Sequence, residues 1–490
     1  MLERVRPEAV GIRPALILNY LKALKDTGFV AHNIMLLRHG KIAFEVHYNP
    51  FRRDVPHELF SCSKSLASTA AGFAVGEGRL SLDEKVVDIL PEKLDGEPHP
   101  FMAVMTVRHL LTMTTAFREF QPISDDWTRD FMNKTPDHYP GTIFNYDSMG
   151  THTLCEIVQK RVGASLLDYL TSRLFEPLGI GADEVRWAKS KYGINLGGGG
   201  ASMSLEAMAK FGQVYLNRGV WENRQILPKG WAEEATTGHV SCVTRDGSFK
   251  SRYGYKFWRV QQNGYACLGL AGQVIAMHPD KDIVFVGTAN GMQTDFHYFH
   301  SEYMWKMLYP EIEDEAVPYD DTGYAELADY ISKAEAFLPD GSREIPKSIR
   351  KYSGKYLTVS SNLLGVEGFK LTLGGTSGEI ELRQGEYRAH IPFGYGVHIP
   401  APQTIREIAN QNWGQFNQSL DGCGNAGIWV DEHTLVIHSQ TVHSLLYFIV
   451  TCHFGAEAIV LSIAPYGIYK FNSLPCALTH VFCSNVSVGD

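Results

Sequence analysis

The sequence predicts an α+β protein of two domains, residues 1–315 and 316–490. Its 490 residues exceed the ~250 to 300 at which a single hydrophobic core usually stops growing. In the first part, two groups of strand-like runs enclose a long helical middle, and in the second, short strand-like runs follow one another between glycines. This order favours a helix-flanked antiparallel sheet with a helical subdomain, followed by an all-β, barrel-like domain.

The first domain opens with a helical pattern from about Pro14 to Thr27. The stretch from His32 to Tyr48 then alternates around a His-Gly-Lys turn, which predicts a hairpin. Helical and turn-rich segments alternate from there to about Gly200. A second strand group is expected between Gly254 and Gly287, from the runs YKFWRV, ACLGLAGQVIAMHP and DIVFVGTA.

An acidic stretch separates the two parts of the chain. Six of the eleven residues from Glu311 to Asp321 are acidic and a proline sits among them, so we expect a linker there. One helix-like piece, YAELADYISKAEAFL, precedes the strand-like runs of the second domain. The apolar segment beginning at Leu445 is interrupted by His453, Gly455 and Glu457, and is expected to form two core strands rather than a membrane span.

Composition excludes several classes of partner. A net charge of -9, with no dense cluster of lysine and arginine, argues against nucleic acid and favours a small neutral substrate. The N-terminus lacks the features of a secretory signal, so a cytoplasmic location without membrane attachment is expected. The eight cysteines are scattered and form no C-x-x-C pair, so they are expected to be reduced and to bind no zinc.

The first candidate for chemistry is the pair Ser61 and Lys64 in the stretch FSCSKSLASTAAGFAVG. On a helix, residues three apart are neighbours, so the hydroxyl and the amine can touch. Burial among Ala, Leu and Phe favours a neutral amine, which can take the serine proton. About two S-x-x-K matches are expected by chance in a chain of this length. The other match, Ser348 to Lys351, has no apolar helix behind it.

Two further segments offer the remaining groups of an acyl-transfer site. Tyr146 and Ser148 follow the turn-forming run PGTIFN, which would hold the phenol in a loop where it can share proton transfer. Glycines interrupt the strand-like run at Gly269-Leu270-Ala271-Gly272-Gln273, and such glycines often mark a place where a ligand or another backbone approaches closely. A backbone amide there, with that of Ser61, would form an oxyanion hole.

Five segments, in this order and spacing, resemble the serine hydrolases related to class C β-lactamases and penicillin-binding proteins. The resemblance runs from about Glu8 to Tyr309, through FSCSKSLASTAAGFAVGEGRLSLDEKV, VRHLLTMTT, PGTIFNYDSMG, LGGGGASMSLEAMAKFGQVYLNRG and LGLAGQVIAMHPDKDIVFV. It implies a β-lactamase/transpeptidase-like fold for the first domain. The C-terminal half is similar to small β-barrel domains appended to some members.

The resemblance also implies roles for single residues. Ser61 would be the acylated nucleophile, Lys64 and Tyr146 would handle protons, and the backbone of Gln273 would complete the oxyanion hole. Substrate contacts would come from Ser148, Leu270 and Gly272, which occupy the corresponding motif positions. Two of these positions depart from the family pattern: Ser148 replaces asparagine, and Leu270 replaces the first Lys or His of a K-T-G or H-x-G triplet.

These observations predict a serine hydrolase for small ester, amide or peptide substrates, with weak or no β-lactam hydrolysis. The groups that bind the amide and carboxylate of a β-lactam are the two that have changed. The alternative is a catalytically silent binding or assembly protein that keeps the fold. No metal and no cofactor are expected, and the sequence leaves open whether the chain forms homo-oligomers.

Overall fold

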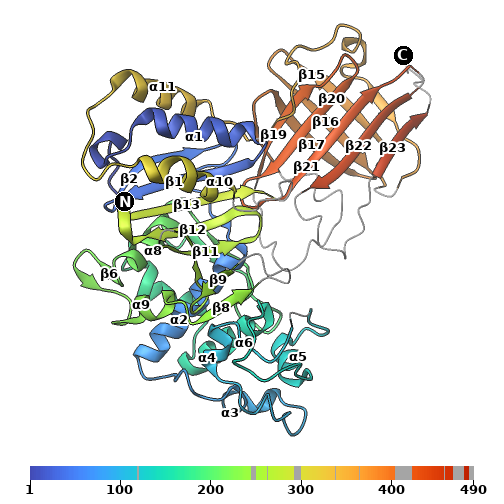
Figure 1. The fold of residues 1–490 in the computed structure, drawn as a ribbon. Coiled ribbons are helices and arrows are strands. Elements are labelled where there is room, and N and C mark those ends of the chain that lie inside the picture. The colour runs from blue at the N-terminus through green and yellow to red at the C-terminus, as the bar shows by residue number, and fades with distance from the viewer. Residues whose placement is uncertain are drawn as a thin grey trace.

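The computed structural model describes residues 1–118, 121–243, 250–261, 263–291, 299–336, 338–362, 365–402, 422–456, 458–466 and 479–484. Its first domain is built on an antiparallel sheet of eight strands within these residues (Figure 1). The strand order is β2 (Lys41–His47), β1 (Val30–Arg38), β13 (Ile283–Asn290), β12 (Gln273–His278), β11 (Tyr265–Gly269), β10 (Trp258–Arg259), β9 (Lys250–Tyr253) and β8 (Val240–Val243). The predicted antiparallel sheet and its first hairpin are confirmed.

The centre of this sheet is covered by helices on both faces. Successive side chains of a strand point to opposite faces, so Met35 and Leu37 enter one core while Ile34 and Leu36 enter another. On the first side lie α2 (Ser63–Gly76) and α8 (Leu205–Leu216), and on the second lie α1 (Pro14–Asp26), α10 (Phe299–Tyr303) and α11 (Asp321–Ser332) (Figure 1). The result is a three-layer arrangement in which α2 is buried almost along its whole length.

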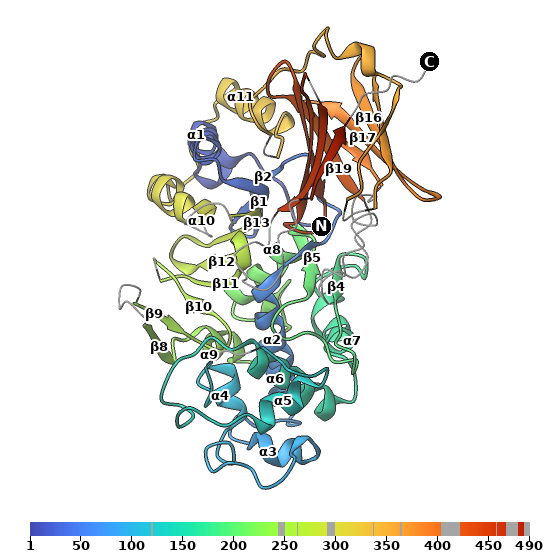
Figure 2. The ribbon, with the colours of Figure 1, turned by 90° about the vertical axis from the view of Figure 1, so that its right-hand side faces the viewer.

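A helical region extends from the α2 side of the sheet, as the long helical middle of the sequence predicts (Figures 1 and 2). Its helices are α3 (Val86–Ile89), α4 (Val107–Leu111), α5 (Trp127–Asn133), α6 (Ser148–Val162) and α7 (Leu166–Leu170). A small three-stranded sheet connects this region back to the main sheet. Its strands are, in order, β3 (His57–Glu58), β5 (Ala201–Met203) and β4 (Val185–Trp187). The chain continues, after α8, with β6 (Val220–Trp221), β7 (Arg224–Gln225) and α9 (Trp231–Thr236).

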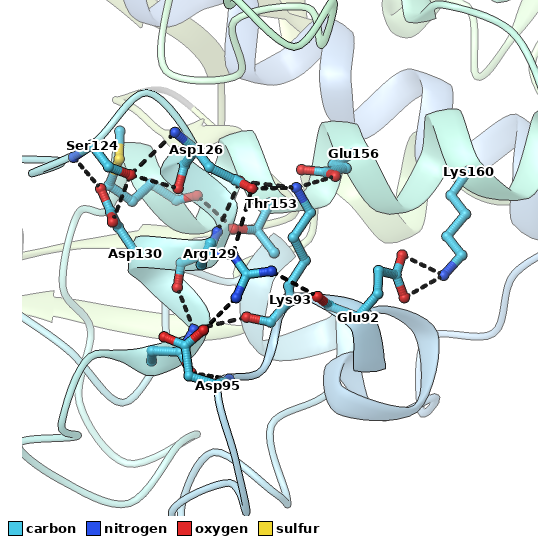
Figure 3. Close-up of polar contacts among 12 residues, drawn as sticks. Glu92, Lys93, Asp95, Ser124, Asp126, Arg129, Asp130, Thr153, Glu156 and Lys160 are labelled. Carbon is cyan, nitrogen blue, oxygen red and sulfur yellow. Dashed lines mark hydrogen bonds and ion pairs between the residues drawn. The ribbon is translucent and has the colours of Figure 1, made fainter.

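Ion pairs hold α5 and α6 together in this region (Figure 3). The Lys93 ammonium lies 2.9 Å from a carboxylate oxygen of Asp126, the residue that caps α5, and 2.9 Å from one of Glu156 on α6. The Lys93 side chain is only 12% exposed, so the pairs are screened less than ordinary surface pairs. These ion pairs therefore fix helix α6 in place, and the first turn of α6 forms part of the site described below.

The second domain is one curled sheet of ten strands, which confirms the predicted all-β domain (Figures 1 and 2). The described strands are β14 (Tyr356–Thr358), β15 (Gly368–Leu373), β16 (Ser377–Gln384), β17 (Tyr387–Tyr395), β18 (Ile399–Ala401), β19 (Cys423–Trp429), β20 (Thr434–Thr441), β21 (Tyr447–Phe454), β22 (Ala458–Tyr466) and β23 (Thr479–Ser484). Strands β17 and β19 pair in parallel, and the other pairs are antiparallel.

The apolar segment beginning at Leu445 forms the neighbouring strands β21 and β22, as predicted. Their inward side chains, among them Phe448 and Leu461, belong to the core of the second domain. Among the described helices, none combines the length and the hydrophobicity that a membrane crossing requires.

The acidic stretch lies against the first domain. Arg13 forms an ion pair with Glu313, and the buried Arg38 guanidinium donates to the Glu313 carbonyl. Helix α11, which follows, packs on α1 and places Leu327 in the core beneath it. The boundary at residues 315 and 316 stays a prediction.

The turn between β20 and β21 joins the two domains beside the start of α2. The amide of Glu58 donates a 2.7 Å hydrogen bond to the His443 carbonyl, and the Ser444 hydroxyl donates to the Glu58 carboxylate. The Asn290 side chain donates a 2.8 Å hydrogen bond to the Leu445 carbonyl. The second domain therefore contacts strands β3 and β13 through one short turn.

Candidate active site

Ser61 and Lys64 face one another at the start of α2. Ser61 lies in the 3-10 turn η2 (Phe60–Cys62), which runs directly into the helix. The Lys64 Nζ lies 2.9 Å from Ser61 Oγ, within hydrogen-bond distance. Lys64 is 1% exposed, whereas Ser61 is only half-buried and keeps solvent-accessible surface. The contact that the spacing predicts is present, and its catalytic use stays a prediction.

A glycine loop fixes the other side of the Lys64 amine. The Lys64 Nζ donates a 2.6 Å hydrogen bond to the Gly198 carbonyl. A Cβ atom added to Gly198 would lie 2.8 Å from the Cβ of Ser148, which is closer than side chains pack. Gly198 is therefore required by the close approach of its loop to the first residue of α6. Ser148, a predicted substrate contact, lies at this approach.

Tyr146 covers the Lys64 amine with its ring. The Lys64 Nζ lies 4.7 Å from the ring centroid. Trp258 of β10 stacks on the same ring at a centroid distance of 5.7 Å, and Tyr253 at the end of β9 meets it edge-on at 6.4 Å. The loop that carries Tyr146 is therefore held by two aromatic side chains from the main sheet.

The residue after Tyr146 anchors this loop. The Asp147 carboxylate caps α6, because it accepts hydrogen bonds from the amides of Met149 and Gly150 at 2.9 and 3.0 Å. It also accepts one from the Thr115 hydroxyl at 2.9 Å. Asp147 is fully buried, and this burial raises its pKa while the hydrogen bonds oppose the rise.

The glycine-interrupted run forms a tight turn between β11 and β12. A Cβ atom added to Gly269 would lie 2.2 Å from the Leu59 carbonyl, so β11 passes directly against the chain that leads to Ser61. Ala271 and Gly272 follow with φ of 62° and 102°, in the region that glycine adopts most readily. The close approach that these glycines predict is present at the turn before α2.

Gln273 uses its side chain to hold this turn in shape. Its amide nitrogen donates to the Leu270 carbonyl at 2.8 Å and to the Ala289 carbonyl at 2.9 Å. The Cys62 thiol donates to the Gln273 carbonyl at 3.5 Å, so the Gln273 backbone lies beside the residue next to Ser61. The role of the Gln273 amide as an oxyanion donor stays a prediction.

Leu270 lies in an apolar cluster rather than beside a charge. Its half-buried side chain packs with Phe60, Ala271 and the fully buried Leu445 of the second domain. One cluster therefore joins three segments: the residue before Ser61, the turn before Gln273 and the turn between β20 and β21.

Sequence reasoning missed two contributors, Gly198 and Asp147. Gly198 contributes only its backbone carbonyl, which accepts the hydrogen bond from Lys64. The sequence therefore shows nothing at this position except a run of glycines. Asp147 follows a turn and precedes a helix, and that position is itself a recognisable capping signal. Both residues of the second S-x-x-K match, Ser348 and Lys351, are exposed and lie outside any α-helix.

Comparisons with known proteins identify a family for the first domain. The sequence profile of the family described as Beta-lactamase matches residues 19–306. The 6-aminohexanoate-dimer hydrolase of Paenarthrobacter ureafaciens is 23% identical over 292 residues, which cover 54% of this chain and 74% of that protein.

Solved structures show the same fold at low sequence identity. A family VIII carboxylesterase superposes with a TM-score of 0.51 and 16% identity, covering 62% of this chain and 99% of the carboxylesterase. A penicillin-binding protein homologue from Caulobacter crescentus superposes with a TM-score of 0.50 and 14% identity, covering 59% of this chain and 93% of the homologue.

Replacing Gly198 by alanine tests whether the glycine loop positions the Lys64 amine. The new methyl group would collide with Ser148, so the loop and its carbonyl must shift. We expect the second-order rate of Ser61 modification by a fluorophosphonate to fall at least about ten-fold, the effect of losing one hydrogen bond in the transition state. Gly96→Ala is the control, because Gly96 is exposed with open space at the Cβ position. A Gly198→Ala protein that reacts like the control would contradict this role.

Proposed function

Since the chain belongs to the beta-lactamase family, we propose that it is a serine hydrolase that works through an acyl intermediate on Ser61. The observation that carries the proposal is the 2.9 Å contact between Ser61 Oγ and Lys64 Nζ. A half-buried hydroxyl beside a buried amine is the arrangement that activates a serine nucleophile.

In the acylation step, the neutral Lys64 amine accepts the Ser61 proton across this contact. The serine oxygen attacks the substrate carbonyl carbon, and the carbonyl π electrons move onto oxygen. The Tyr146 ring lies against the same amine, and its phenol shares the proton. As the oxyanion electrons re-form the carbonyl, the bond from the carbonyl carbon to the leaving oxygen or nitrogen breaks, and the proton passes to this leaving alcohol or amine. The Gly198 carbonyl holds the ammonium that forms transiently on Lys64.

The oxyanion would be bound by the backbone amides of Ser61 and Gln273. The position of the Gln273 backbone beside Cys62 supports this assignment. Deacylation reverses the steps with water as the nucleophile: its proton passes to the Lys64 and Tyr146 pair, and Ser61 recovers a proton as the acid leaves.

The substrate class follows from Leu270 and Ser148. Leucine at the first triplet position offers no charge to a substrate carboxylate, and its surroundings are apolar. Small neutral esters, amides or peptides are therefore favoured over β-lactams. The name of the Paenarthrobacter relative, a 6-aminohexanoate-dimer hydrolase, is compatible with a substrate other than a β-lactam.

The rival function is a catalytically silent binding or assembly protein. The replacements at Ser148 and Leu270 favour it. Against it stands the burial of Lys64 beside Ser61, because a buried amine costs stability and a protein without catalysis would have no reason to keep it there. Reaction of Ser61 with a substrate separates the two functions.

The Ser61→Ala variant tests the proposed nucleophile. Hydrolysis of p-nitrophenyl acetate should fall at least about 1,000-fold, because the acyl intermediate of the proposed reaction forms on the Ser61 hydroxyl. The matched control is Ser68→Ala on the same helix, because the buried Ser68 hydroxyl has no hydrogen-bond partner among the described residues. The proposal fails if the Ser61→Ala protein retains the turnover of the Ser68→Ala protein.

The ratio of kcat/KM for nitrocefin to that for short-chain esters tests the substrate class. The ratio should lie below one in the native protein and should rise about 10- to 100-fold in Leu270→Lys, because a charge-assisted hydrogen bond contributes ~1.5 to 3 kcal/mol. Leu270→Met keeps an apolar side chain and should leave the ratio unchanged. A native enzyme that prefers nitrocefin would refute the preference.

A further inference from the structure

A second lysine, Lys256, is buried behind the candidate active site. It lies in the turn between β9 and β10 and is 2% exposed. Its backbone has φ of 66°, in the left-handed region that is unfavourable for a residue with a long side chain. Position 256 thus combines backbone strain with a buried amine, and each of these lowers the stability of the fold.

The contacts of Lys256 tie it to both elements that carry the proposed proton carriers. Its Nζ donates to the Met113 sulfur at 3.1 Å, and the same sulfur accepts the Asp147 amide at 3.2 Å. The Lys256 carbonyl accepts a 2.7 Å hydrogen bond from the Ser65 hydroxyl. Ser65 follows Lys64 on α2, so the turn is fastened to α2 and to the start of α6.

Three titratable groups surround the Lys256 amine. The Asp147 carboxylate and the Cys155 thiol lie on the α6 side, and Lys64 lies on α2. Burial lowers the pKa of Lys256 to about 7, Asp147 opposes this fall, and a charged Lys64 adds to it. Burial raises the pKa of the Cys155 thiol, which therefore stays neutral. The two amines repel each other when both are protonated, so their protons leave in steps that belong to the pair.

A purely structural role does not account for Lys256. The Asp147 carboxylate already accepts three hydrogen bonds, from Thr115, Met149 and Gly150, and needs no lysine to complete the cap. The Met113 thioether is a weak acceptor for a buried amine. An apolar side chain at position 256 would serve packing better than a charge.

We infer that Lys256 is a positioning residue that supplies a second positive charge beside α2 and the start of α6. When it is protonated, the Lys256 amine interacts favourably with Asp147 and disfavours a proton on Lys64. This inference rests on the proposed function, because it concerns proton transfer from Ser61.

The test is the pH dependence, from pH 5.5 to 9, of the second-order rate at which a fluorophosphonate inactivates the full-length protein. Lys256→Met removes the charge and keeps the volume, and Lys256→Gly removes the charge and relieves the backbone strain. Both variants should move the midpoint of the rising limb upward by about one pH unit, and the rates at high pH should converge with the native rate.

Lys22→Met is the matched control, because Lys22 is exposed on α1 and far from these contacts. The inference is overturned if the folded variants lower the rate equally at every pH or leave the midpoint unchanged. It is also overturned if neither variant folds, since Lys256 would then serve the fold. An unreactive native protein would instead refute the proposed function.

Discussion

The burial of the Lys64 amine within one helical turn of Ser61 is the constraint on which the rest of the site depends. An amine that is 1% exposed can remain there only if every polar neighbour is fixed, because water cannot compensate a misplaced partner. The Gly198 carbonyl and the Tyr146 ring supply those fixed neighbours. Each comes from a different part of the chain, so the first domain must fold as a whole before the site exists.

The second domain belongs to this arrangement through a single turn. Leu445 packs on the same cluster as Phe60 and Leu270, and the backbone of the turn is bonded to Glu58 and Asn290. These residues flank Ser61 and the proposed oxyanion turn. The curled sheet therefore acts on the site by supporting its apolar edge.

The sequence predicted the features that local periodicity determines. The contact of Ser61 with Lys64 follows from helical spacing, and the close approach at Gly269 follows from a glycine within a strand. It could not predict contacts that depend on tertiary placement. Gly198 contributes only a carbonyl. Lys256 falls in the run YKFWRV, which the pattern predicts as a strand, and its positive φ and its burial emerge only when α2, α6 and the β9–β10 turn meet.

Peptide mapping of the fluorophosphonate adduct tests the central claim most directly. Trypsin releases residues 54–64 as one peptide, which contains both Ser61 and Ser63 and ends at Lys64. Tandem mass spectrometry of the fully inactivated protein should find one adduct per chain, in this peptide and on Ser61. An adduct on Ser63 or in any other peptide, together with loss of hydrolytic activity, would contradict the account.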